Sequence, residues 1–301
     1  MADKKIIAVV GATGAQGGGL VRAIVNDPGS GFVARAITRD VNSEKAQALA
    51  KLGVEVVAAN LDDADSLARA FAGAYGVFCL TNFWEHFSPE KEYAQVQAQA
   101  AAAKNAAVHH AIWSTLEDTR KWVPLTDNRM PTLMGKYKVP HFDAKGEADQ
   151  EFTKLGVPTT FLLTSFYWDN MISFGMGPKK GPDGLLTFTL PMGDKKLPCI
   201  AAEDIGKTVA IAGEHLTGAE MAATMSKAFG QPVRYNAVTP EQYRAFGFPG
   251  ADDLGNMFQF KQEFNDAFCG PRNPAVARSL NPAVLTFETW LAQNKNRIPL
   301  T

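Results

Sequence analysis

The sequence is poor in the features that most quickly assign a protein to a special class. It has three cysteines in 301 residues (Cys79, Cys199 and Cys269), and their odd number and wide spacing argue against a disulfide framework and a cysteine metal site. We therefore expect reduced thiols and a cytoplasmic location. No apolar run reaches membrane-spanning length. The net charge of −1 does not favour binding to polyanions such as nucleic acid. We expect no direct contact with nucleic acid and no membrane association.

The N-terminal segment resembles a buried strand more than a signal peptide. Lys4 and Lys5 precede an apolar run at 6–10 that is too short for a signal-peptide core, and the next residues include several glycines. The overall composition, 46% hydrophobic and 20% charged, predicts a folded core. The length suits one large α/β unit with an appended lobe.

The first half of the chain alternates strand-like and helix-like segments. Expected strands are 6–10, 33–38, 54–58, 77–80, 111–114 and 159–163, and expected helices are 20–25, 44–52, 66–71, 89–107 and 142–155. Such alternation predicts a parallel sheet with right-handed crossovers. We therefore predict an α/β Rossmann fold, a doubly wound parallel sheet, over residues 1–164.

The character of the sequence changes after Thr164, which predicts a smaller α+β lobe over 165–301. A hairpin is expected between 185–190 and 195–199, and helices at 217–229, 240–246 and 287–294. Part of 200–230, with a strand candidate at 208–212, is expected to return to the Rossmann sheet. The aromatic residues expected to form the core of the lobe are Phe246, Phe248, Phe258, Phe260 and Phe264.

A glycine-rich turn comes directly after the first predicted strand. Its sequence is Gly11-Ala12-Thr13-Gly14-Ala15-Gln16-Gly17, and a helix is predicted immediately beyond it. Glycines let the backbone turn tightly and let a pyrophosphate approach without a Cβ clash. The helix N-terminus then offers N–H groups and a partial positive charge. This context favours a dinucleotide site over a plain tight turn.

The end of the second predicted strand indicates which dinucleotide binds. NAD-binding proteins usually place a carboxylate there for the ribose 2′-hydroxyl, whereas this chain has Thr38-Arg39. A guanidinium suits a phosphate dianion, so we predict that NADP(H) is preferred over NAD(H). The alternative is that Arg39 is a solvated loop charge, and the carboxylate of Asp40 argues slightly for it.

Taken together, these motifs resemble the NmrA-like family, a group of atypical short-chain dehydrogenases that includes proteins regarded as NADPH sensors. The likeness covers nearly the whole chain. The residues that carry it include Gly11 to Gly18, Thr38-Arg39, Thr81-Asn82-Phe83-Trp84-Glu85, His141 to Glu147, Asp169-Asn170, Gly247 to Ala251 and Leu280-Asn281-Pro282.

The resemblance implies a set of cofactor contacts beyond the turn. Leu61 and Asp62 would lie beside the adenine, and Thr81-Asn82-Phe83 would flank the middle of the cofactor. Lys145 would reach the nicotinamide ribose, and the nicotinamide end would meet Tyr167, Trp168, Asp169 and Asn170.

Three departures from the family pattern stand out. Asn42-Ser43-Glu44 replaces a segment that often carries a basic residue, and Ala94 stands where relatives have a lysine. The segment after Asp204 also lacks a helix that relatives usually insert.

The catalytic tyrosine of short-chain dehydrogenases is missing. In their Tyr-x-x-x-Lys motif the lysine lowers the tyrosine pKa, and a nearby serine orients the substrate. Here the lysine is Lys145, His141 stands at the tyrosine position, and Ser114 or Thr115 is the serine candidate. Tyr137 is another donor only if the helix extends that far, and Pro140 argues that it does not.

These residues leave two alternative functions, besides the plainer interpretation of a degenerate Rossmann protein that binds no ligand tightly. The first is an NADP(H)-binding redox sensor whose occupancy is reported to regulatory partners, with a homodimer and a nuclear location also considered. The second is an NADPH-dependent reductase of a small carbonyl or quinone, with His141 as acid. We expect no metal site, because Asp62, Asp63 and Asp65 fit helix capping better.

Overall fold

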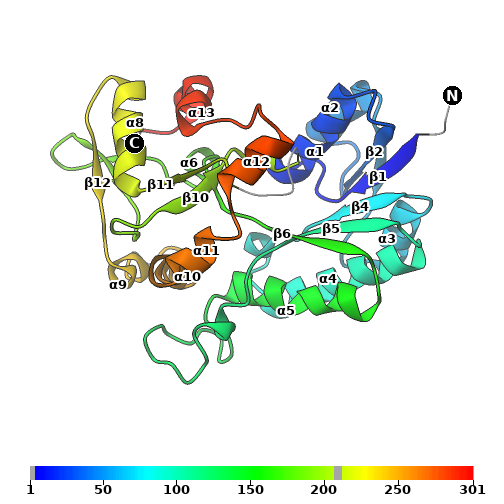
Figure 1. Ribbon diagram of the computed structural model, residues 1–301, viewed down its shortest axis with the longest axis horizontal. Coiled ribbons are helices and arrows are strands. Elements are labelled where there is room, and N and C mark those ends of the chain that lie inside the picture. Colours follow the sequence, from blue (N-terminus) through cyan, green and yellow to red (C-terminus); the bar gives the residue numbers. More distant parts are fainter. Residues whose placement is uncertain (1–3, 207–211, 301) are drawn as a thin grey trace. The chain divides into compact units, whose positions relative to one another are not determined.

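The computed structural model describes residues 4–206 and 212–300 (Figure 1). The chain divides into two compact units. The first comprises 1–118, 141–163 and 203–207, and the second comprises 119–140, 164–202 and 208–301. The Rossmann topology belongs to the first unit.

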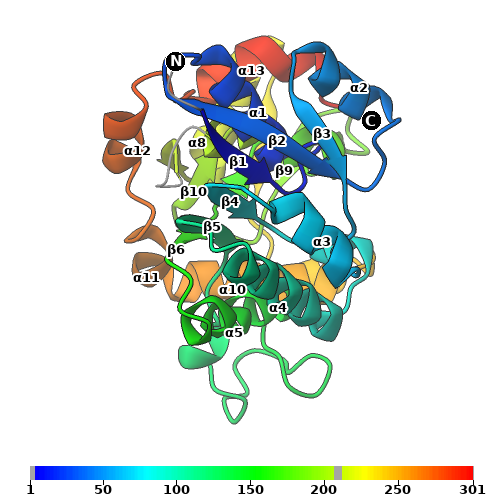
Figure 2. The same cartoon turned by 90° about the vertical axis from the view of Figure 1, so that its right-hand side faces the viewer.

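The first unit contains a parallel sheet in the order β3-β2-β1-β4-β5-β6, and the strands succeed one another in this order in Figure 2. The strands are β1 (Lys5–Val9), β2 (Phe32–Thr38), β3 (Glu55–Ala58), β4 (Gly76–Cys79), β5 (His110–Thr115) and β6 (Thr159–Leu163). This is the strand order of the Rossmann fold, with the chain reversing direction across the sheet between β1 and β4. The predicted fold class is confirmed.

Three helices of the first unit begin at a residue whose side chain caps them. Ser43 accepts a hydrogen bond from Ala46 N at the start of α2, and Asp63 accepts from Asp65 N and Ser66 N at the start of α3. Ser88 caps α4, whose first residue is Pro89. The helices are α1 (Ala15–Asn26), α2 (Glu44–Lys51), α3 (Ala64–Phe71), α4 (Pro89–Asn105) and α5 (Pro140–Lys154), with η1 (Phe83–Glu85) between β4 and α4.

The core of the first unit lies between the sheet and its helices. Leu67 and Phe71 of α3, Trp113 of β5 and Phe152 of α5 are completely buried in it. Trp113 and Phe152 stack with ring centroids 6.0 Å apart. This packing fixes the carboxyl ends of the strands, where a Rossmann fold binds its ligand.

The second unit contains two three-stranded sheets, ordered β11-β10-β7 and β12-β9-β8. The strands are β7 (Phe166–Tyr167), β8 (Lys179–Lys180), β9 (Leu186–Thr189), β10 (Leu197–Ile200), β11 (Glu214–Leu216) and β12 (Val233–Asn236). The helices are η2 (Thr119–Lys121), α6 (Asn170–Ser173), α8 (Gly218–Phe229), α9 (Pro240–Arg244), α10 (Ala251–Glu263), α11 (Asn265–Cys269), α12 (Pro274–Leu280), α13 (Phe287–Asn294) and η3 (Lys295–Arg297). The short helix α7 (Ala202–Ile205) belongs partly to each unit.

The hairpin predicted between 185–190 and 195–199 is wrong. The strands β9 and β10 both form, but they belong to different sheets. β9 pairs with β8 and, in parallel, with β12, whereas β10 pairs with β11 and, in parallel, with β7. Partners distant in sequence therefore replace the local pairing that the intervening turn suggested. The strand candidate at 208–212 lies, apart from Ala212, outside the described residues.

The aromatic core expected in the second unit is only partly correct. Phe258 and Phe260 of α10 are completely buried, but Phe246 and Phe248 are 52% and 38% exposed. These two residues lie between α9 and α10 and pack on one side against Tyr243, with centroid distances of 5.4 and 5.7 Å. A loop position leaves the other side of each ring in solvent.

Candidate functional site

The glycine-rich turn connects β1 to α1 and leaves no room for side chains at its centre. Gly11 has φ of +64°, a left-handed conformation that favours glycine. A Cβ on Gly17 would lie 2.6 Å from the carbonyl oxygen of Gly11 and 2.7 Å from that of Val10. The start of α1 therefore packs directly against the turn, at a position that only glycine can occupy. In phosphate-binding turns of this kind, the N–H groups of the first helical turn have no partner within the helix and can bind an anion. The turn fits a dinucleotide pyrophosphate.

The end of β2 carries the residues expected to select the cofactor. Thr38 is the last residue of the strand, and the side chain of Arg39 is 65% exposed. The Arg39 guanidinium forms an ion pair with Glu85, which lies in η1. Asp40 turns its carboxylate toward its own loop, where it accepts a hydrogen bond of 2.8 Å from Asn42 N.

The predicted adenine residues lie just beyond β3. Leu61 packs against the core, and the carboxylate of Asp62 is held by two residues of α4. Gln95 Nε2 donates to Asp62 Oδ1 over 2.8 Å, and Lys91 Nζ lies 2.9 Å from Asp62 Oδ2. The hydrogen bonds from Gln95 and Lys91 lower the pKa of Asp62. Asp62 therefore stays ionised at neutral pH and is tied to the start of α4.

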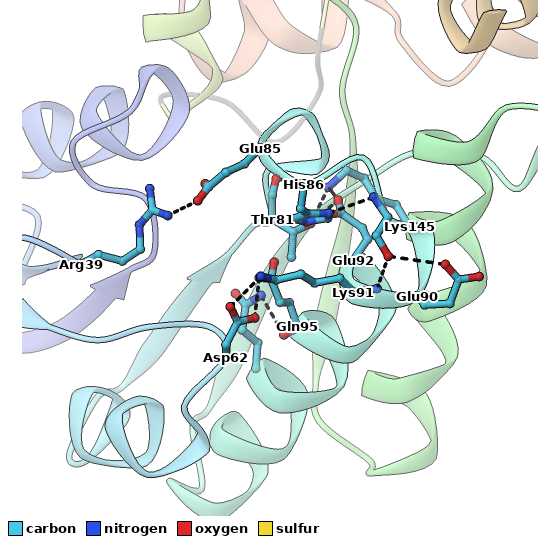
Figure 3. A network of polar contacts seen from close by, with 12 residues as sticks. Arg39, Asp62, Thr81, Glu85, His86, Glu90, Lys91, Glu92, Gln95 and Lys145 are labelled. Atoms are coloured by element: carbon cyan, nitrogen blue, oxygen red, sulfur yellow. Dashed lines mark hydrogen bonds and ion pairs between the residues drawn. The ribbon is translucent and has the colours of Figure 1, made fainter. Parts of the chain in front are cut away.

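The segment after β4 carries the residues predicted to flank the middle of the cofactor. Thr81 and Phe83 are buried, whereas Asn82 is exposed. Thr81 belongs to the polar network that also includes Lys145 (Figure 3). The three residues predicted to flank the cofactor thus lead from β4 into η1.

Lys145 of α5 forms a compact polar triad with the buried residues Thr81 and Glu92. Its Nζ forms an ion pair with Glu92 Oε1 and donates to Thr81 Oγ1 at 2.5 Å. Thr81 Oγ1 in turn donates to the same carboxylate oxygen over 2.6 Å. Lys145 also lies 5.2 Å from the centre of the Trp113 ring. Glu92 therefore fixes the lysine that the sequence assigned to the nicotinamide ribose.

Glu92 is a completely buried carboxylate that remains charged. Burial alone raises its pKa, but the Lys145 ammonium and contacts from His86 and Thr81 outweigh that effect and bring the pKa to about 2. His86 Nε2 lies 3.3 Å from Glu92 Oε2, in a contact whose geometry is not that of a hydrogen bond. The acid and the lysine thus form one ion pair at neutral pH.

His141 lies in the first turn of α5, one helical turn before Lys145. Its ring is buried among aromatic side chains, with centroids 4.7 Å from Trp84, 4.8 Å from Phe142 and 5.9 Å from Phe83. The helix begins at Pro140, so Tyr137 is not on the same helical face, as the proline indicated. The imidazole replaces the tyrosine in position but sits in an aromatic packing environment.

Ser114 and Gln16, predicted for different roles, contact one another. The Ser114 hydroxyl donates to Gln16 Oε1 over 2.8 Å and so connects the end of β5 to the first turn of α1. The neighbouring Thr115 donates to Asp149 of α5 over 2.6 Å. Of the two serine-like candidates, Ser114 is therefore the one beside the glycine-rich turn.

The remaining predicted contacts belong to the second unit. Tyr167, Trp168, Asp169 and Asn170 lie where β7 leads into α6. Trp168 is buried against Phe287 and Trp290, and Asp169 accepts a hydrogen bond of 2.8 Å from Ala202 N. Their contact with a cofactor remains a prediction.

Residues 4–206 and 212–300 contain no group of three or more His, Cys, Asp or Glu side chains suited to a metal ion. Within the same residues, every helix is too short or too polar to cross a bilayer.

Two acidic residues of the site, Glu85 and Glu92, escape sequence reasoning. Glu85 lies in the family-like motif at 81–85, but nothing in that motif indicates a contact with Arg39. Glu92, Gln95 and Gln99 are buried on α4 at the spacing of one helical face. The sequence signal that could have identified Glu92 is the presence of polar residues on the buried face of an alanine-rich helix.

Comparisons with known proteins bear on the family and on the fold. The model of the NmrA-like family matches residues 3–291. The NmrA-like family domain-containing oxidoreductase FrzB of Cladobotryum sp is 28% identical over 302 residues, covering 88% of this chain and 86% of the relative. The NAD(P)H azoreductase of Xenophilus azovorans is 29% identical over 255 residues, covering 79% and 78%.

Solved structures show the same fold. NmrA, a negative transcriptional regulator, in complex with NADP superposes with a TM-score of 0.77 at 23% identity, covering 97% of this chain and 95% of that one. The same regulator has also been solved with NAD. At this level of identity the likeness extends to the fold and no further.

Proposed function

The chain belongs to the NmrA-like family, and from this premise we propose that it is an NADP(H)-binding redox sensor. The observation that carries the proposal is the pairing of a bare glycine turn before α1 with an exposed guanidinium at the end of β2. These two features suit the pyrophosphate and the 2′-phosphate of one dinucleotide. The NADP and NAD complexes of the regulator NmrA support a nucleotide at this place.

In this proposal each part of the first unit has one task. The turn from Gly11 to Gly17 holds the pyrophosphate, and Arg39 holds the 2′-phosphate. Leu61 and Asp62 border the adenine, and Thr81 to Phe83 border the middle of the molecule. Lys145, kept in place by Glu92, donates to the nicotinamide ribose. In the alternative reductase considered below, the bound reduced coenzyme would supply a hydride.

A sensing role is supported by the surroundings of His141. A short-chain dehydrogenase presents a tyrosine as proton donor at this position, whereas here an imidazole packs among three aromatic rings. A sensor needs only that the partner-competent form binds NADPH with a different affinity from the other form. Regulatory protein partners, a homodimer, and a cytoplasmic or nuclear location complete the proposal.

The cofactor preference is tested by titration calorimetry with NADPH and NADH. We expect wild type to bind NADPH more tightly and Arg39→Ala to lose most of that preference, about 10- to 100-fold, because a charged hydrogen bond is worth about 1.5–3 kcal/mol. Arg69→Ala, which removes an exposed arginine from the last turn of α3, is the control and should behave as wild type. Equal affinity of the wild type for both cofactors would contradict the preference.

The second candidate function is an NADPH-dependent reductase of a small carbonyl or quinone. It is favoured by the fixed Lys145, which stands one helical turn from His141, and by relatives named as oxidoreductases. A sensor should show no NADPH oxidation above background with a panel of quinones, aldehydes and azo dyes. Steady turnover that His141→Phe abolishes, with NADPH affinity retained, would replace the sensor by the reductase.

A further inference from the structure

One ion pair in the first unit joins the end of β2 to η1 at the surface, outside the core. It connects Arg39 to Glu85, whose side chains are 65% and 46% exposed (Figure 3). The Glu85 carboxylate is therefore already paired with the Arg39 guanidinium, which the proposed function assigns to the 2′-phosphate.

We propose that Glu85 is a specificity-determining residue that competes with the 2′-phosphate of the cofactor for Arg39. The inference rests on the proposed NADP(H) site and adds to it a residue that opposes the preference set by Arg39. Glu85 lowers the affinity for NADP(H), and it leaves that for NAD(H) unchanged or slightly higher. The ratio of the affinities for NADP(H) and NAD(H) therefore depends on two oppositely charged residues, Arg39 and Glu85.

The competition has its origin in charge. A 2′-phosphate next to Arg39 brings a dianion close to the Glu85 carboxylate, and like charges at short range repel. The phosphate must therefore displace Glu85 or share the guanidinium with it, and either change costs free energy. A ribose 2′-hydroxyl is neutral and can donate to a carboxylate, so NAD(H) meets no such cost.

The cost is modest because the pair is exposed. Exposed ion pairs contribute about 0.2–1 kcal/mol, which corresponds to roughly a 1.4- to 5-fold change in a binding constant. This range suits a residue that tunes selectivity without closing the site. Glu92, on the neighbouring helix α4, differs because it is completely buried and bound to Lys145 and Thr81. It anchors the segment that carries Glu85.

The experiment compares the NADPH and NADH affinities of wild type, Glu85→Gln and Glu90→Gln by titration calorimetry at low ionic strength. Glu90 is an exposed carboxylate in the first turn of α4, so its variant removes the same charge from the same segment. We expect Glu85→Gln to bind NADPH about two- to fivefold more tightly and NADH no more tightly than wild type. Glu90→Gln should keep the wild-type ratio of affinities.

A second variant separates this inference from the proposed function. In an Arg39→Ala background, the Glu85→Gln change should favour NADPH by a smaller factor than in wild type, because only the repulsion between Glu85 and the phosphate is left once the shared guanidinium is gone. If Arg39→Ala weakens NADPH binding but Glu85→Gln leaves the ratio as in the Glu90→Gln control, the competition is wrong and the 2′-phosphate site stands. If Arg39→Ala leaves NADPH binding unchanged, both the phosphate site at Arg39 and the competition are wrong.

Discussion

The two ends of the polar network place similar ion pairs in opposite environments. Arg39–Glu85 is exposed, whereas Lys145–Glu92 has a completely buried carboxylate and a lysine that is 11% exposed. Removing one partner of a buried pair leaves an uncompensated charge, but removing one partner of an exposed pair leaves a solvated one. One short segment thus carries a carboxylate fixed in the interior at one end and a solvent-exposed carboxylate at the other.

The largest expected effect comes from removing Lys145, the counter-ion of the buried carboxylate. Lys145→Met should lower the free energy of unfolding by about 3 kcal/mol, because Glu92 would stay buried without a counter-ion. Urea unfolding followed by circular dichroism measures it. Lys154→Met, on the same helix, is the control, because its ion pair with Glu151 has a lysine that is 58% exposed. Similar losses in both variants would show that burial of Glu92 is not the cause.

Removing the buried anion should cost less. Glu92→Gln keeps the shape of the side chain, and Lys145 retains both its bond to Thr81 and some contact with solvent. We expect a loss of about 1–3 kcal/mol in the free energy of unfolding. The double variant Lys145→Met with Glu92→Gln should be more stable than Lys145→Met alone, since it buries no unpaired charge. Additive losses would contradict the coupling of the two residues.

The acid dependence of stability should report the same pair. The pKa of Glu92 is about 2 in the folded chain against an ordinary value of 4.5, so its ionisation stabilises the fold above about pH 4.5. That contribution is lost as the pH falls from about 4.5 to about 2. The difference in unfolding free energy between wild type and Glu92→Gln should therefore be constant near neutral pH and shrink in this window. A difference that stays constant down to pH 2 would rule out the charged pair.

The smallest effect on stability is expected at the exposed pair. Glu85→Gln should change the free energy of unfolding by less than about 1 kcal/mol, because solvent screens both charges. Thermal unfolding in low and in high salt measures it, and salt should remove what difference exists. A large loss of stability would make Glu85 a structural residue, and the contrast between the two ends of the network would disappear.

The parallel sheet could be predicted because its signals are local. Each strand is a short apolar run, and caps such as Ser43 and Asp63 mark the helix starts. The second unit was harder, because β9 and β10 pair with strands distant in sequence. The sequence of α10 shows no clear apolar face, because two of its buried residues, Asn256 and Gln259, are polar. Their side-chain amides donate hydrogen bonds to backbone carbonyls.

The candidate site could be predicted in its backbone parts better than in its charges. The glycine turn, Arg39 and Lys145 have sequence signatures that do not depend on neighbours. Glu92 gains its role only when α4 packs beside α5, and Glu85 only when η1 approaches the end of β2. Both contacts join segments that are far apart in the chain. A single sequence does not show which of its many carboxylates will meet a given cation.

The spacing of Glu85 and Glu92 has a practical consequence for redesign. The two carboxylates, together with Lys91 and Gln95 at Asp62, come from one uninterrupted stretch, residues 85–95. Exchanging this stretch alone would replace the partners of Arg39, Lys145 and Asp62 in a single step. Under the proposed function, a graft of residues 85–95 from another family member should therefore alter coenzyme choice while leaving the strands of the parallel sheet untouched.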